Sequence, residues 1–167
     1  SPFHDAAVLC LLPSAAMSME RPSWLRRWRW PIALLMLLLL AETFLRSYYG
    51  FCDTVLLRED PNYEYIPQAD QDRWRFRHHI RYNSLSMRSD EPDSTAIVLL
   101  GCGDSVINGG VLTDQDSLAT TLLSDRLSTA FHRKVQLLNI SAGSWGPDNC
   151  LAYLEHTPLP AAKAIVL

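Results

Sequence analysis

The most sustained apolar run in the chain lies near its N-terminus. Residues 30–41 are 12 consecutive uncharged positions, and at about 1.5 Å per residue a helix of this length spans roughly 18 Å, less than the ~30 Å hydrocarbon core of a bilayer. Only Glu42 separates this run from a further Thr-Phe-Leu sequence, and no A-x-A-like cleavage site follows. We therefore expect residues 24–45 to form an uncleaved transmembrane or signal-anchor helix. A cleaved signal peptide and a buried helix of a soluble protein are the alternatives.

The charges around this run predict its orientation. Four arginines precede it within residues 21–29, and the near downstream flank is poorer in them. The positive-inside rule then places residues 1–23 in the cytoplasm and the chain after Tyr48 outside the cytoplasmic membrane. The first residue is Ser, and Met17 or Met19 looks like a natural start. Aromatic residues flank the run on both sides, as in interfacial belts: Trp24, Trp28, Trp30, Tyr48, Tyr49 and Phe51.

From residue 96 onward, short apolar segments alternate with segments of helical spacing. Such alternation predicts an α/β fold with a parallel sheet and right-handed crossovers. We expect the first of three strands to lie between the other two, and Asp114 or Asp116 to cap the first helix. The predicted strands are residues 96–100, 135–140 and 164–167, and the predicted helices are residues 117–131 and 147–156.

Residues 46–95 are predicted to be an extracytoplasmic connecting region, because prolines and polar residues interrupt it repeatedly. Within it, residues 73–81 alternate strictly between Trp74, Phe76, His78 and Ile80 on one side and mostly arginine on the other, which predicts one strand. One interpretation is an anion-binding edge for an acidic polysaccharide or for lipid headgroups. The other, which we prefer, is an edge strand whose charges prevent self-pairing.

Composition narrows the classes of function. A net charge of −3 gives no sign of a nucleic-acid-binding surface. The four cysteines form no CxxC and no paired metal spacing, so we expect no metal and no cofactor. A disulfide between Cys102 and Cys150 is one option in an oxidising compartment, because both should lie near the carboxyl ends of adjacent strands. Buried or free thiols are the preferred interpretation.

The strongest chemical signal is Gly103-Asp104-Ser105, which follows the first predicted strand. A serine just past the carboxyl end of a strand occupies the place where open α/β sheets put their chemistry. The second predicted strand leads into a related loop over residues 139–148, Asn-Ile-Ser-Ala-Gly-Ser-Trp-Gly-Pro-Asp. The chain has no phosphate-binding G-x-x-x-x-G-K-[ST] and no G-x-S-x-G nucleophile elbow. The plainest alternative is a tight turn in which Ser105 only caps a helix.

The two loops together resemble the first two sequence blocks of the SGNH (GDSL-type) esterase and acyltransferase superfamily. The resemblance implies a three-layer, flavodoxin-like parallel sheet in which Ser105 is the acyl-accepting nucleophile. Asp104 would organise its loop, and Asn139 would fix the second loop. The oxyanion would be held by the N–H of Ser105 and by that of Gly143 or Ser144, which remain equal candidates. Residues 82–91 are similar to a segment that often precedes the domain, with Ser86 where Gly is usual.

The family's two later blocks, G-x-N-D and D-x-x-H, do not occur in the 167 residues. They would supply an Asn donor, the base and its orienting acid, so residues 96–167 are expected to be the N-terminal part of such a domain, without activity by themselves. His156 follows the second block and is expected on the surface.

The resemblance implies an extracytoplasmic serine ester hydrolase or O-acetyl transferase, acting on an envelope polysaccharide or another small acyl ester. An inactive, carbohydrate-binding or assembly protein of the same fold is the alternative.

Overall fold

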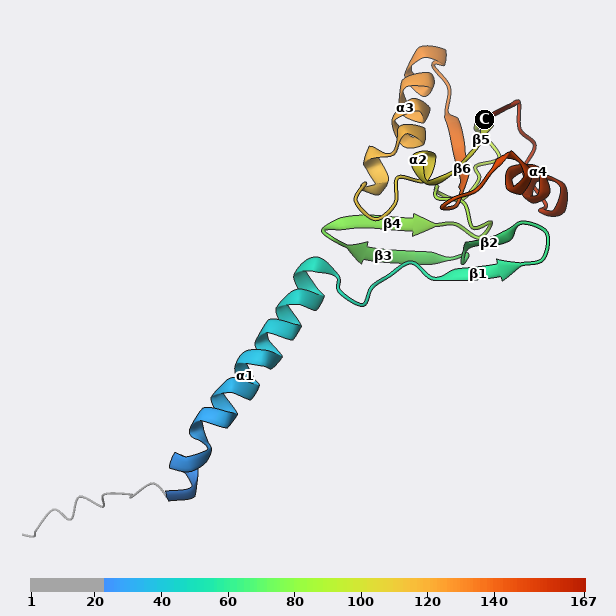
Figure 1. The fold of residues 1–167 in the computed structure, drawn as a ribbon. Coiled ribbons are helices and arrows are strands. Elements are labelled where there is room, and N and C mark those ends of the chain that lie inside the picture. Colours follow the sequence, from blue (N-terminus) through green and yellow to red (C-terminus); the bar gives the residue numbers. More distant parts are fainter. Residues whose placement is uncertain (1–22) are drawn as a thin grey trace, which may run out of the picture. The chain divides into compact units, whose positions relative to one another are not determined.

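The computed structural model describes residues 23–167, so the expected cytoplasmic segment and the candidate start residues lie almost entirely outside it. Helix α1, Ser23–Tyr49, begins where the apolar run predicted a helix and continues four residues past the predicted end. Its segment Arg27–Tyr49 has a mean hydropathy of 1.5, and none of it is buried. Within the described residues, the chain therefore has one helix long and apolar enough to span a membrane or to act as a signal anchor. Residues 40–167 form one compact unit (Figure 1).

The centre of this unit is a three-stranded parallel sheet with the order β6-β5-β7. Strand β5 is Ile97–Gly103, β6 is Val135–Ser141 and β7 is Ala164–Val166. The sequence prediction of a parallel sheet with its first strand in the middle is confirmed. Strand β5 is longer than predicted, because Gly101 to Gly103 continue the ladder with Asn139 to Ser141.

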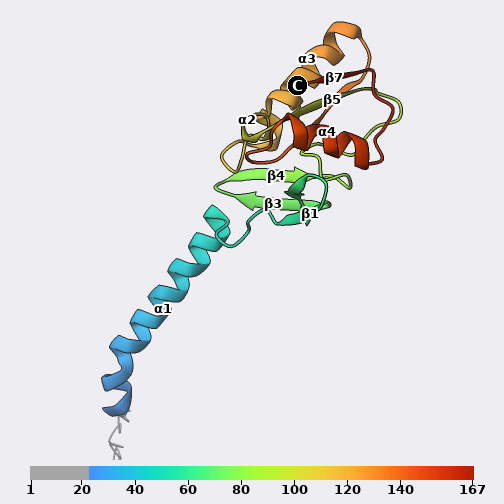
Figure 2. The same ribbon diagram turned by 45° about the vertical axis from the view of Figure 1, so that its right-hand side comes forward.

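One helix covers each face of the sheet (Figures 1 and 2). Helix α3, Ala119–Phe131, packs on β6, and α4, Pro147–His156, lies on the opposite face with the bounds that the sequence predicted. Helix α3 starts later than predicted because a 3-10 turn, η1 (Gln115–Ser117), precedes it. Asp114 caps η1 rather than α3, since its carboxylate accepts from the N–H of Asp116 at 3.2 Å.

The segment before the sheet contributes to the same core. It forms two antiparallel hairpins, β1 (Leu57–Asp60) with β2 (Glu64–Pro67), and β3 (Gln71–Arg75) with β4 (His78–Tyr82). Tyr63, Ile66 and Met87 are buried in one apolar cluster with side chains of β5, β6 and α4. Burial of this kind gives roughly 1.5–3 kcal/mol per large apolar side chain, so residues 50–95 are held on the sheet.

The prediction of a single strand over residues 73–81 is wrong. The chain turns at Phe76 and Arg77, both with positive φ (49° and 67°), as a two-residue type I′ hairpin turn requires. Neither residue is the Gly or Asn that usually marks such a turn, so the sequence pattern did not indicate a turn here. Because the pairs are Arg73 with Ile80 and Trp74 with His79, Trp74 and Ile80 lie on opposite faces, with Ile80 fully buried.

Candidate functional site

Ser105 opens the short helix α2, Ser105–Asn108, two residues past the end of β5. The capping residue is Asp104, whose carboxylate accepts from the N–H of Val106 at 2.8 Å. Asp104 and Ser105 are both exposed. Among residues 23–167, no group hydrogen-bonds the Ser105 hydroxyl. Asp104 therefore caps the helix, and the serine hydroxyl is left facing solvent.

The second loop follows β6 at the same edge of the sheet, since Gly103 pairs with Ser141. Gly143 and Ser144 are exposed, and neither N–H is bonded within the described part of the chain. Ser144 has a φ of +59°, the left-handed conformation that normally selects Gly, whereas a Cβ on Gly143 would meet no atom within 4 Å. The backbone at Ser144 therefore has a conformation that Gly usually occupies.

Two buried asparagines join the loops. Asn139 has no exposed surface; its Nδ2 donates to the carbonyl of Ile107 in α2 at 2.7 Å, and its Oδ1 accepts from the Ser141 hydroxyl at 2.5 Å. Asn108, at the end of α2, donates to the carbonyl and the hydroxyl of Ser141 at 3.2 and 3.1 Å. These bonds fix α2 to the end of β6, so Asn139 supports the loop and does not face solvent.

Arg88 is a site residue that sequence reasoning did not single out. It is 1% exposed, and its guanidinium donates to the carbonyls of Asn108 and Thr113 at 2.6 Å each and to that of Gly110. Burial lowers its pKa from the ordinary arginine value. The charged guanidinium therefore binds three carbonyls of the loop that follows Ser105. The only sequence signal was its place in the 82–91 segment.

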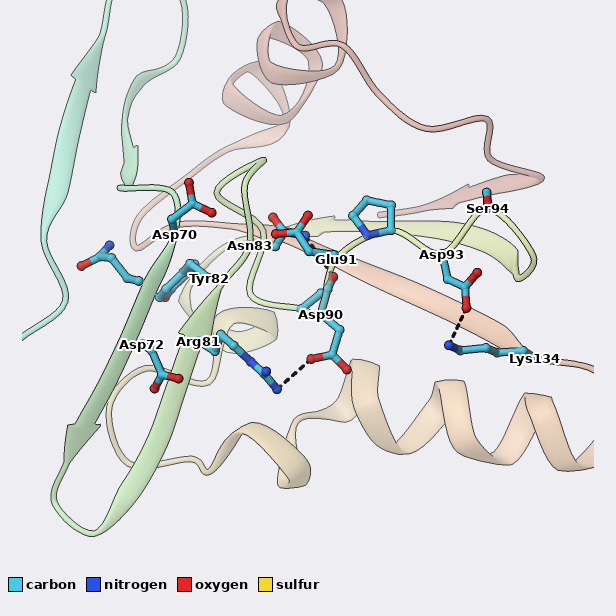
Figure 3. A pocket seen from close by; sticks show the side chains of 13 residues that line it. Asp70, Asp72, Arg81, Tyr82, Asn83, Asp90, Glu91, Asp93, Ser94 and Lys134 are labelled. Carbon is cyan, nitrogen blue, oxygen red and sulfur yellow. Dashed lines mark hydrogen bonds and ion pairs between the residues drawn. The ribbon is translucent and has the colours of Figure 1, made fainter.

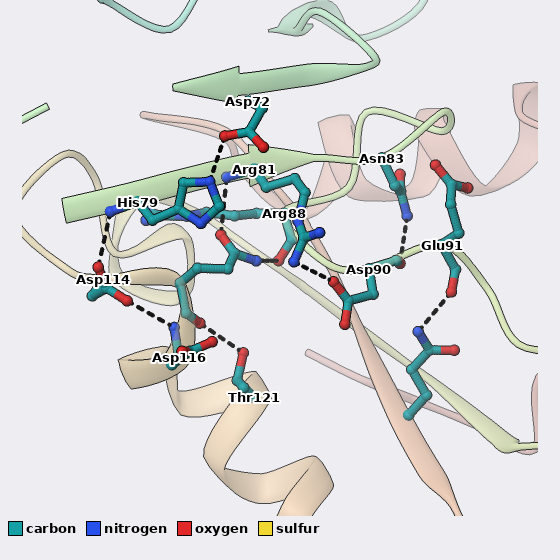
Figure 4. A network of polar contacts seen from close by, with 12 residues as sticks. Asp72, His79, Arg81, Asn83, Arg88, Asp90, Glu91, Asp114, Asp116 and Thr121 are labelled. Carbon is teal, nitrogen blue, oxygen red and sulfur yellow. Dashed lines mark hydrogen bonds and ion pairs between the residues drawn. The ribbon is translucent and has the colours of Figure 1, made fainter. Parts of the chain in front are cut away.

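Side chains at the start of η1 also accept hydrogen bonds from backbone N–H groups of β4 (Figure 4). Gln115 accepts from the Arg81 N–H at 3.1 Å and donates to the carbonyl of Arg88 at 3.4 Å. Asp114 accepts from the N–H of His79 at 2.8 Å, and this bond holds the pKa of Asp114 below its usual range. The outer edge of β4 is therefore closed by the chain that follows the Ser105 loop.

The first hairpin holds the second loop from the other side. The hydroxyl of Tyr65 donates to the carbonyl of Gly143, and the carbonyl of Tyr65 accepts from Trp145 Nε1 at 2.9 Å. Trp145 is buried against Tyr63 and Tyr153. A hollow of about 140 Å³ lies beside this loop. Its lining is mostly apolar: Val55, Leu57, Pro67, Tyr82, Asn108, Gly110, Val111, Ala142 and Gly143.

No described side chain provides a base for Ser105. None of the four histidines within residues 23–167 hydrogen-bonds it. His156 is exposed at the end of α4, and its ring contacts the carbonyl of Ala152 at 2.8 Å. His79 contacts Asp72 on the exposed face of the hairpin. The described residues also contain no group of three or more His, Cys, Asp and Glu that could hold a metal ion.

Cys102 and Cys150 are both buried and both free thiols, and they lie in contact. Burial raises the pKa of Cys102 to about 12, with its neighbour Cys150 adding to the effect. A thiol protonated over the whole physiological range is inert. The two cysteines therefore pack in the core between β5 and α4. Cys10 lies outside the described residues.

A larger hollow, of about 770 Å³, lies between β3, β4 and the segment before β5 (Figure 3). Its basic residues are already paired, Arg81 with Asp90 at 2.8 Å and Lys134 with Asp93 at 2.6 Å. None of the candidate site residues lines it.

Comparison with known proteins returns no match: no family model, no curated protein and no solved structure corresponds to this chain.

Proposed function

We propose that this chain carries the nucleophile and the oxyanion-binding loops of an extracytoplasmic serine ester hydrolase or O-acyltransferase of the SGNH type. One observation carries the proposal: the free, exposed Ser105 hydroxyl lies at the same sheet edge as the unbonded N–H groups of Gly143 and Ser144. The Asp104 cap, the Asn139 bonds and the Arg88 contacts hold these two loops in register. A nucleophile beside preorganised N–H donors is the arrangement that acyl transfer needs.

In the proposed reaction, Ser105 Oγ attacks the ester carbonyl and passes its proton to a base. The negative oxygen of the tetrahedral intermediate is held by the Ser105 N–H and by that of Gly143 or Ser144. The intermediate collapses to an acyl-serine as the alcohol leaves with the proton. Water or an acceptor hydroxyl then takes the acyl group and restores Ser105. The resemblance implies that the base and its orienting acid come from the two later blocks, which do not occur in these 167 residues.

The hollow beside Gly143 favours a small acyl group. Its volume of about 140 Å³ is small beside the roughly 300–1,000 Å³ of sites that bind drug-sized ligands. Its apolar walls suit an acetyl-sized group rather than a charged one. Acetyl esters on an envelope polysaccharide are the substrate class that combines this size with the proposed location.

The test uses the gene product extended past Leu167 and a short-chain aryl acetate. Ser105→Ala is expected to lower kcat/KM by at least ~10³-fold, because the remaining donors cannot form the acyl intermediate. Ser94→Ala is the control, since Ser94 is exposed and hydrogen-bonds none of the described residues. The chain ending at Leu167 is expected to show no Ser105-dependent turnover.

Two outcomes contradict this proposal. Turnover by the chain ending at Leu167 would show that its base lies within these residues, with His156 the first to test. Equal activity of the wild type and Ser105→Ala in the extended product would remove Ser105 as nucleophile. That result would support the alternative of an inactive carbohydrate-binding or assembly protein.

The proposed location can be tested independently of the chemistry. We propose that α1 anchors the protein with its N-terminus in the cytoplasm, because the arginines cluster before the apolar segment. A reporter active only outside the cytoplasm, fused after Tyr49, is expected to be active. The same fusion made with a reporter active only in the cytoplasm is expected to be silent, and activity there would overturn the orientation.

A further inference from the structure

The end of α1 and the tip of the β3–β4 hairpin share one row of aromatic rings. Ring centroids are 5.2 Å apart between Phe44 and Tyr48, 4.9 Å between Tyr48 and Tyr49, and 5.9 Å between Tyr49 and Phe51. The row ends on Phe76 at the hairpin turn, 6.1 Å from Phe51. Tyr48, Tyr49 and Phe51 are each more than a third exposed. An exposed aromatic row thus runs from the apolar helix to the hairpin tip.

Backbone contacts hold the tip against the helix end. The N–H of Phe76 donates to the carbonyl of Tyr49 at 2.7 Å. Gly50 has a φ of +65°, and a Cβ there would lie 1.8 Å from the carbonyl oxygen of Trp74. Only glycine allows this approach. The hairpin tip therefore lies beside the end of α1.

Two arginines at this tip have no acidic partner. Arg75 lies over the Phe76 ring at 4.8 Å, and Arg77 lies over the Tyr48 ring at 5.3 Å. Within residues 23–167, neither is within ion-pair distance of a carboxylate, whereas Arg73 pairs with Asp53 and Arg46 with Glu42. Both guanidinium groups are free to bind an external anion.

These arginines are not needed to protect the strand edges of the hairpin. On β3, the N–H of Trp74 donates to Asp53 at 2.7 Å, and on β4 the N–H of His79 donates to Asp114 at 2.8 Å. Side chains thus already close both outer edges, so prevention of strand pairing does not explain the charges at the turn.

We propose that the hairpin tip is a second membrane contact, in which Arg75 and Arg77 bind the phosphates of anionic phospholipids and Trp74 and Phe76 lie at the headgroup level. Tryptophan and tyrosine gather at this depth, and arginine binds phosphate through several donors. Each arginine near an anionic surface contributes about a fivefold change in partition, so the pair contributes roughly 25-fold. The proposal rests on membrane placement of α1 and is independent of the ester chemistry.

The experiment measures amide hydrogen exchange of the full chain in nanodiscs of phosphatidylcholine, with and without phosphatidylglycerol. Exchange at residues 74–79 is expected to slow several-fold when phosphatidylglycerol is present. The effect should vanish in Arg75→Gln/Arg77→Gln and weaken at 1 M salt, where the Debye length falls to about 3 Å. The control is the double variant Arg126→Gln/Arg133→Gln, which removes the same charge from exposed positions on and after α3. We expect it to behave as the wild type.

Exchange at α1 reports insertion in the same experiment, so loss of the anchor is distinguished from loss of the tip contact. Equal exchange at the tip in both lipid mixtures, with α1 protected, would overturn the proposal. Protection by soluble polygalacturonate in neutral discs, with none from phosphatidylglycerol, would overturn it in favour of an acidic polysaccharide.

Discussion

Ser86 carries two local costs that a smaller residue would avoid. Its φ is +62°, in the left-handed region that costs an L-residue other than Gly roughly 1–2 kcal/mol. Its hydroxyl is buried, with no hydrogen-bond partner among the described residues. A hydroxyl buried in this way costs about 1–3 kcal/mol. The backbone shape belongs to the turn that carries Met87 and Arg88 into the core.

Ser86→Gly is therefore expected to stabilise the protein. Glycine removes the strain and the unpaired hydroxyl, and its larger loss of chain entropy, about 0.5–1 kcal/mol, offsets only part of the gain. We expect a net increase of at least about 1 kcal/mol in the free energy of unfolding, measured by urea titration in detergent micelles. Ser94→Gly, at an exposed position without positive φ, is expected to be neutral or slightly destabilising. A loss of stability in Ser86→Gly would show that the hydroxyl has a bound partner.

At the scale of elements, the candidate site depends on the side chain of Arg88, which links the hairpin region to the loop after α2. The three carbonyls that Arg88 contacts lie in residues 108–113, and its own N–H donates to the carbonyl of Asn139 at 2.9 Å. The arginine therefore contacts both loops of the candidate site. Lysine retains the charge but cannot reproduce the planar fork of donors.

Arg88→Lys is expected to loosen the Ser105 loop before it unfolds the protein. We expect exchange at residues 108–113 to accelerate at least tenfold and the free energy of unfolding to fall by about 2–3 kcal/mol, since two buried carbonyls lose charged donors. In the active product, kcat should fall more than KM rises. Arg81→Lys is the control, because Arg81 makes an exposed ion pair with Asp90. Unchanged exchange in Arg88→Lys would remove this positioning role.

The elements that were predicted correctly share a strong local signal. The strands at β5 and β6 are short apolar runs, and α4 begins with a proline at its first turn. The hairpin turn at Phe76 and Arg77 was missed because no Gly, Asn or Asp marks it. At the candidate site, the two loop motifs drew attention to Ser105, Asp104 and Asn139. Arg88 was not singled out, because it donates hydrogen bonds to carbonyls 20 to 25 residues away. Such contacts depend on tertiary packing, which spacing in the sequence does not encode.

At the scale of the whole compact unit, several weakly acidic side chains are buried, and burial favours their neutral form. Cys102, Tyr82 and Tyr153 are buried, and burial raises the pKa of each, that of Cys102 to about 12. In the unfolded chain the thiol ionises at about 9. The unfolded state therefore releases protons at a lower pH than the folded state does, and these groups stabilise the fold fully below pH 9.

The free energy of unfolding is consequently expected to fall as the pH rises from 9 towards 12. Each such group removes about 1.4 kcal/mol per pH unit while it is ionised only in the unfolded chain. Urea titrations in reducing buffer between pH 8 and 10.5 should show this decline. Cys102→Ala should make the decline shallower, whatever its stability at pH 8, whereas Ser94→Ala, which removes no titratable group from an exposed position, should not change the slope. A flat profile in the wild type would mean that the core groups ionise in the folded state, and hence that water reaches the space between β5 and α4.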